Sequence, residues 1–228
     1  MSHPLPSVSG EGMASVVPPD HLDTTEVRWF VTGELPESLV DWFIRSGRAT
    51  LEVRHDSYIV DGSHDAGSKI RDHGTFEVKL RTGSRGPFHL GSGVRSRIEE
   101  WQKFVGLQTP PDRTWVDVGK VVLTRTYQLD AEDDVSEVRV RDMFTPGCDV
   151  ELATVSVGDT KAWTFAFEVW GPEDRRLHIL AETASRFVAD SGLPPAPTPV
   201  QTPDMGYPEW LATVELTEGG SGRCASLE

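Results

Sequence analysis

The strongest constraint on the fold of this chain is a repeated alternation of charged and apolar residues. Between Glu26 and Gly171 most apolar residues recur at every second position, which is the period of a β-strand. Turn sequences such as TGSRG, TPG and VGD separate the alternating segments. The pattern predicts strands at Glu26–Thr32, Leu51–Val60, Ser68–Asp72, Thr75–Arg81, Val94–Val105, Val116–Leu129, Val135–Asp142, Asp149–Val157 and Ala162–Trp170.

The polar face of these strands carries charge rather than the usual Ser, Thr and Asn. It holds eleven basic and seven acidic residues, a sum of +4 in a chain whose net charge is -14. One interpretation is a solvent-exposed sheet face with cross-strand ion pairs. The alternative is a closed barrel, because many strands and few helices leave little else to cover the sheet edges. We expect a barrel with a charged, water-filled interior and an apolar exterior covered by helices.

Two helices are predicted, at Leu35–Ser46 and at Asp174–Ser191, where apolar residues follow helical spacing. Residues 1–23 are rich in Pro, Ser and Gly and are expected to form a flexible leader. The main domain is therefore expected at 24–192. Residues 193–228 begin with a proline-rich tether, which is incompatible with a helix, followed by a short docked segment at Glu209–Leu216 and a frayed tail.

Composition excludes several classes of protein. A net charge of -14 argues against a general nucleic-acid-binding protein. No apolar run approaches the length of a membrane-spanning helix, and no secretory signal is evident. Two cysteines, Cys148 and Cys224, make no disulfide framework, so a reduced, cytoplasmic location is expected.

Several motifs resemble the CYTH-like triphosphate tunnel superfamily. They are TEVRWF (25–30), DSYIVD (56–61), GSKIRDHGTFEVKLR (67–81) and ELATVSVGDTKAWTFAFEVWG (151–171), and the resemblance covers about residues 24–190. The superfamily includes inorganic triphosphatases, thiamine triphosphatases and class IV adenylate cyclases. The resemblance implies a mainly β fold, a closed antiparallel eight-stranded barrel with covering helices. It also implies a metal-dependent hydrolase of triphosphates or related organic phosphates.

The resemblance assigns the charged residues to two roles. Basic side chains would hold a small-molecule polyphosphate or organic phosphate, which carries about four negative charges in a triphosphate. Carboxylates would hold Mg²⁺ or Mn²⁺. No catalytic residue is assigned. The metal candidates are Glu26, Glu151 and Glu168, and the phosphate-binding candidates are Arg28, Lys69, Arg71, Lys79, Arg81, Arg95, Arg97, Lys120, Arg139 and Arg141.

The first strand departs from the family signature Glu-x-Glu-x-Lys. This chain has Arg28 in place of the second acid and Phe30 in place of the lysine, and Val122 stands where a second cation is often expected after Lys120. These departures favour an alternative function, a non-catalytic protein that binds a phosphorylated metabolite or another anion. A structural interaction module is a third possibility. Glu168 is accordingly either a metal ligand or a partner in a buried ion pair.

Overall fold

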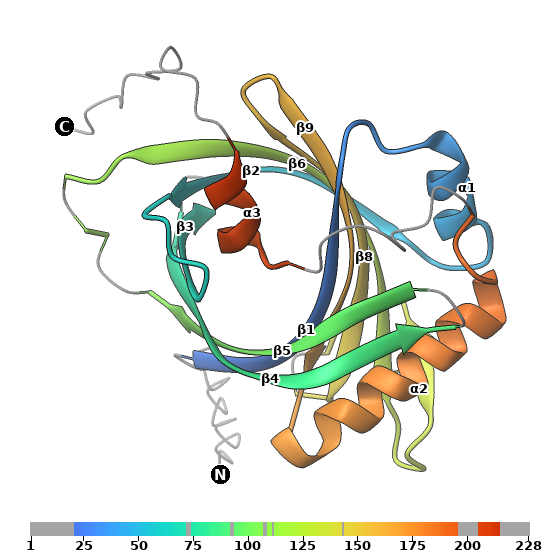
Figure 1. Cartoon of the computed structure of the whole chain (residues 1–228). Helices are drawn as coiled ribbons and strands as arrows, with labels where there is room; N and C mark the ends of the chain where they lie inside the picture. The colour runs from blue at the N-terminus through green and yellow to red at the C-terminus, as the bar shows by residue number, and fades with distance from the viewer. Residues whose placement is uncertain are drawn as a thin grey trace, which may run out of the picture.

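The chain forms a closed antiparallel β-barrel, as predicted (Figure 1). The computed structural model describes residues 21–71, 74–91, 94–106, 109–110, 112–142, 144–195 and 205–214. Eight strands follow one another in the order β2-β3-β4-β5-β1-β9-β8-β6, and pairing of β2 with β6 closes the ring. A ninth strand, β7, extends the sheet from β6 outside the ring.

The element bounds agree with the sequence pattern in most places. The helices are α1 (Glu37–Arg45), α2 (Glu173–Ser191) and α3 (Tyr207–Thr213). The strands are β1 (His21–Thr32), β2 (Thr50–Ile59), β3 (Ala66–Arg71), β4 (Phe76–Leu90), β5 (Val94–Val105), β6 (Trp115–Leu129), β7 (Val135–Val138), β8 (Gly147–Val157) and β9 (Thr160–Trp170).

Three strand ends differ from the prediction by more than two residues. β1 begins at His21, inside the predicted leader, because residues 21–23 pair with the end of β5; residues 1–20 lie outside the described residues. β4 continues to Leu90 rather than ending at Arg81, because two register irregularities let its Gly- and Pro-containing half stay paired with β5. β7 ends at Val138 rather than Asp142, so Arg139 and Arg141 lie beyond the strand.

The apolar faces of the strands point outward and are covered by helices, as expected. α1 and α2 pack against the outer face of β1, β8 and β9 in one cluster of buried residues (Figure 1). Phe187 of α2 is fully buried and contacts Phe165 of β9 at 5.9 Å between ring centroids, and Trp42 of α1 contacts the same Phe165 at 5.7 Å. The main hydrophobic core therefore lies between the barrel and its helices, which leaves the barrel interior to polar side chains.

A buried arginine links the C-terminal end of α2 to the sheet. The guanidinium of Arg125 on β6 donates two hydrogen bonds to Glu137 of β7, at 2.9 and 3.0 Å, and one to Ser191 at the end of α2, at 2.6 Å. A Cβ atom at position 47 would overlap this guanidinium, which explains the glycine there. Among the described residues no helix is both long and apolar enough to cross a membrane.

The C-terminal segment docks against the barrel, close to where the sequence predicted. Residues 196–204 of the predicted tether and residues 215–228 lie outside the described residues. α3 occupies Tyr207–Thr213, against a predicted segment of Glu209–Leu216, and its Trp210 and Leu211 are buried. Figure 1 shows α3 within the ring of strands rather than on its outer surface.

Candidate functional site

The barrel encloses a cavity of about 420 Å³ that is lined mainly by charged side chains. Every strand of the eight-stranded ring contributes, because every second residue of a strand points to the same side. Eight cationic and six anionic side chains line it: Arg28, Arg54, Lys69, Arg71, Lys79, Lys103, Lys120 and Arg141, with Glu26, Glu52, Glu77, Asp149, Glu151 and Glu168.

Most of the predicted site residues meet in this cavity. The three metal candidates line it, and so do six of the ten phosphate-binding candidates, namely Arg28, Lys69, Arg71, Lys79, Lys120 and Arg141. Arg95 is exposed on the extended β4–β5 hairpin, and Arg139 is exposed just beyond β7, so the structure brings neither to the cavity. Arg81 and Arg97 instead form ion pairs with Glu99, beside α3.

Among the cavity-lining residues that were not predicted as site residues, Arg54 and Tyr207 are the most important. Arg54 of β2 lines the cavity, and the alternation of Glu52, Arg54 and Asp56 within a predicted strand was a signal that could have revealed it. Tyr207 also lines the cavity. No strand pattern points to it, because it comes from α3 and reaches the interior only through the tertiary fold.

A buried carboxylate organises the cations of β2, β3 and β6. Asp56 is fully buried and accepts hydrogen bonds from Lys120 at 2.8 Å and from Lys69 at 3.2 Å, and the guanidinium of Arg54 lies 3.8 Å away. Burial opposes ionisation of Asp56, but these cations, Lys120 first, outweigh it and hold its pKa below the usual range. Tyr58 accepts a further hydrogen bond from Lys120, at 2.7 Å.

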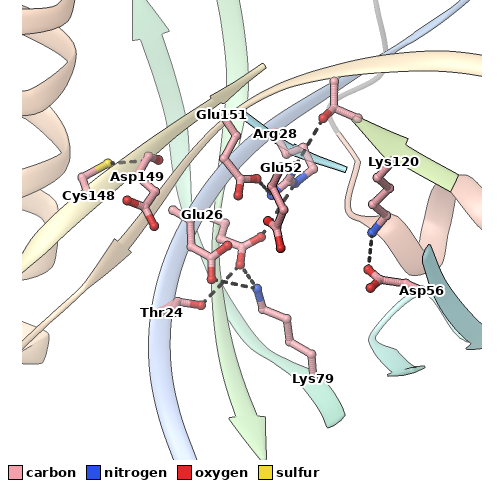
Figure 2. Close-up of polar contacts among 12 residues, drawn as sticks. Thr24, Glu26, Arg28, Glu52, Asp56, Lys79, Lys120, Cys148, Asp149 and Glu151 are labelled. Atoms are coloured by element: carbon pink, nitrogen blue, oxygen red, sulfur yellow. Dashed lines mark hydrogen bonds and ion pairs between the residues drawn. The ribbon is translucent and has the colours of Figure 1, made fainter. Parts of the chain in front are cut away.

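A second group of charges joins β1, β4 and β9. Lys79 reaches across the cavity to form an ion pair with Glu26, as Figure 2 shows, and lies 3.6 Å from Glu168. Glu26 and Glu168 lie opposite each other on the paired strands β1 and β9, so the ammonium group of Lys79 lies close to both carboxylates. Burial raises the pKa of Glu168, but Lys79, Lys103 and Arg28 outweigh it and lower the net value.

Arg28, which stands where the CYTH-like signature has an acid, is bound within the same interior. Its guanidinium donates to Glu151 of β8 at 3.1 Å and to the Thr164 hydroxyl of β9 at 3.4 Å (Figure 2). Arg28 is thus an internal partner of one of the predicted metal ligands. Burial opposes the charged form of Arg28, but Glu151, Tyr207 and Glu168 together outweigh burial and raise its pKa, so the guanidinium stays charged.

Asp149 differs from Glu77, Glu151 and Glu168, because its pKa is raised rather than lowered. Burial raises its pKa to about 6, although Arg141 lies 2.9 Å away and Thr126 donates a hydrogen bond at 2.7 Å. The neighbouring charges of Glu151 and Glu168 add to the increase. The rim near Arg141 is therefore electrostatically different from the Asp56 cluster, where cations outnumber the acid.

The carboxylates of the cavity are of the chemical type that binds a hard divalent cation, but they are not arranged to do so in this structure. Carboxylate oxygens are the donors that Mg²⁺ and Mn²⁺ prefer. Among the residues that the structure describes, no group of three or more His, Cys, Asp or Glu side chains is placed to hold a metal ion. Lys79 and Arg28 neutralise the carboxylates of the predicted set instead.

No protein-family model matches this chain, and a search of curated proteins finds no match. An eight-stranded antiparallel barrel occurs in more than one family, so the architecture by itself does not establish the CYTH-like resemblance. Fold and site together define a barrel whose interior is ionic and whose apolar faces are covered from outside. The chemistry of the cavity is therefore the feature that indicates a function.

Proposed function

We propose that this protein binds a triphosphate or a related phosphorylated small molecule inside the barrel. The observation that carries this proposal is the convergence of eight cationic side chains, seven of them from six strands of the ring, on one cavity of about 420 Å³. Arginine and lysine are the residues that recognise phosphate, and walls of low dielectric strengthen their field. The strands hold these groups in place, so little reorganisation accompanies binding.

The electrostatics of the lysines support an anionic ligand. Burial lowers the pKa values of Lys69, Lys79 and Lys120, and neighbouring cations lower them further. The protein's own carboxylates therefore compensate these ammonium groups incompletely. A phosphate anion would supply the missing negative charge, and it would do so where water is largely excluded.

Divalent-metal-dependent hydrolysis of the bound triphosphate is a second candidate function. The specific observation in its favour is the Glu26–Lys79–Glu168 arrangement, in which one cation already lies between two carboxylates on adjacent strands. If phosphate draws Lys79 away, the two acids become available to Mg²⁺ or Mn²⁺. Such an ion neutralises developing charge and lowers the pKa of bound water.

Calorimetric titration with tripolyphosphate tests the primary proposal. Lys79→Met should weaken binding about 10- to 100-fold, because a charge-assisted hydrogen bond contributes about 1.5–3 kcal/mol. Lys161→Met is the matched control, since Lys161 is exposed and pairs with Glu34 outside the cavity. Unchanged binding in Lys79→Met, or no binding by the wild-type protein, would refute the proposal. Phosphate release in Mg²⁺ or Mn²⁺ then separates a hydrolase from a binding protein.

A further inference from the structure

α3 lies across one end of the barrel and packs among residues that come from around the ring of strands. Its apolar side belongs to a cluster of buried residues from β1, β2, β6, β8 and β9. Its other contacts reach the remaining three strands. A Cβ atom on Gly67 of β3 would come within 2.9 Å of Pro208, and Glu209 forms ion pairs with Arg81 of β4, at 3.9 Å, and Arg97 of β5, at 3.2 Å.

The centre of this closure is an aromatic stack. Trp210 of α3 stacks on Phe30 of β1, with 5.0 Å between ring centroids and 11° between ring planes. Tyr207 meets the same Phe30 edge-on at 5.0 Å and stacks on Tyr58 of β2 at 5.9 Å. Phe30 is one of the departures from the signature of the first strand. The structure gives it a role, because it forms the surface on which the C-terminal helix docks.

Tyr207 forms the floor of the cavity. Its ring lies 3.9 Å from the ammonium of Lys120 and 5.0 Å from the guanidinium carbon of Arg28. Such cation–π contacts hold both cations against the closed end. The residues at this end are almost inaccessible, since Arg28 is 7% exposed, Tyr58 5% and Lys120 3%.

The opposite end of the cavity is open. Glu52 and Arg141 line the same cavity, yet their side chains are 51% and 31% exposed. Lys103, at the end of β5, is 21% exposed. The exposed fraction of the lining side chains thus rises from the floor at Tyr207 toward one rim. The cavity is therefore a cup with a single opening, not a channel that is open at both ends.

We propose that this cup accepts only the end of a phosphate chain, which enters at the Glu52–Arg141 rim with its terminal phosphates directed at Arg28 and Lys120. The inference rests on the proposed phosphate binding and narrows the ligand class to short oligophosphates and the terminal phosphates of organic esters. A long polyphosphate cannot run through the barrel, because α3 blocks the second exit. It can bind only by its two ends.

The stoichiometry of binding to long-chain linear polyphosphate tests this inference. Sedimentation or light scattering should show no more than two protein molecules per chain, one at each end, however long the chain is. The double substitution Trp210→Ala, Leu211→Ala removes the apolar closure and should allow more than two. Circular dichroism checks that this variant keeps its fold.

The outcomes separate the two proposals. Absence of tripolyphosphate binding by the wild-type protein would overturn the proposed function and this inference together. Binding of tripolyphosphate with more than two wild-type molecules per long chain would overturn this inference alone. If the folded double variant still binds with no more than two molecules per chain, α3 is not what prevents a chain from passing through the barrel. If that variant does not fold, the wild-type stoichiometry still decides, and Glu209→Gln supplies a milder perturbation of the same helix.

Discussion

Substitution of the two partners of the Asp56–Lys120 ion pair should change the stability of the protein in opposite directions. Asp56 lies 2.8 Å from Lys120, 3.2 Å from Lys69 and 3.8 Å from Arg54. With an effective dielectric constant of about 20, each of these attractions amounts to about 4–6 kcal/mol. Asp56→Asn removes all three and leaves the cations repelling one another. We expect it to lower the free energy of unfolding by about 3–5 kcal/mol.

Lys120→Met should have the opposite effect. It removes one attraction, but it also removes repulsion from Lys69 and Arg54 and the burial of an ammonium that is 3% exposed. Burial and these neighbours lower the pKa of Lys120, so the folded state binds its proton less tightly than the unfolded chain does, and folding is less favourable at neutral pH. Asp56 keeps two cationic partners. We expect Lys120→Met to raise the free energy of unfolding by about 1–2 kcal/mol.

Urea unfolding at neutral pH, followed by circular dichroism, measures both effects, with Lys161→Met as the exposed control. The same samples should show a thermal stabilisation by tripolyphosphate that Lys120→Met reduces, because the stabilised variant has lost a ligand contact. If Lys120→Met destabilises the protein as much as Asp56→Asn does, the reasoning is wrong. Lys120 would then be a structural partner of Asp56 and not a cation that the fold holds at a cost in stability.

Two further predictions concern the acidic side of the cavity. The pKa of Asp149 is about 6, against 3.8 for the free side chain, so the folded state binds this proton more tightly than the unfolded chain does. The free energy of unfolding should therefore fall by up to about 3 kcal/mol as the pH rises from about 4 to 6. Asp149→Asn should lack this pH dependence in unfolding experiments, and an unchanged pH profile in the variant would show that Asp149 is not its source. Tripolyphosphate should tighten Mn²⁺ binding about 5- to 150-fold by releasing Glu26 and Glu168 from Lys79. Calorimetry with Glu168→Gln distinguishes this coupling from the binding of Mn²⁺ to free tripolyphosphate. If the wild-type protein binds Mn²⁺ tightly without tripolyphosphate and Glu168→Gln does so too, Glu168 is an ion-pair residue and not a metal ligand.

The local sequence pattern was sufficient to predict the strands and the orientation of their side chains. The strand Val94–Val105 was predicted with the bounds that the structure has, and Glu77 and Lys79 of β4 point inward as their alternation indicates. The physical reason is that a strand alternates its two faces at every residue, so burial of one face fixes the other. Charge on the inner face also required closure, because an open sheet of this kind would leave its edges unpaired.

The sequence could not show where that pattern ends. Arg139 and Arg95 continue the alternation of their strands, yet β7 stops at Val138 and the β4–β5 hairpin extends beyond the ring, so both side chains are exposed. Arg81 follows the inward pattern but pairs with Glu99 and Asp65 instead of lining the cavity. Whether a charged side chain faces the cavity depends on its height along the barrel, which is set by the stagger between strands.

The alternation in the sequence therefore determined by itself that this chain forms strands with a charged face. The number of basic residues on that face indicated an anionic ligand. Tertiary structure decided which charges compensate each other, because Lys79 and Glu26 or Arg28 and Glu151 meet only when distant strands close the ring. It also decided that the barrel has one mouth. Trp210 and Phe30 lie 180 positions apart, and only the folded chain brings them into contact, since a docking surface is defined by shape and burial rather than by a local period.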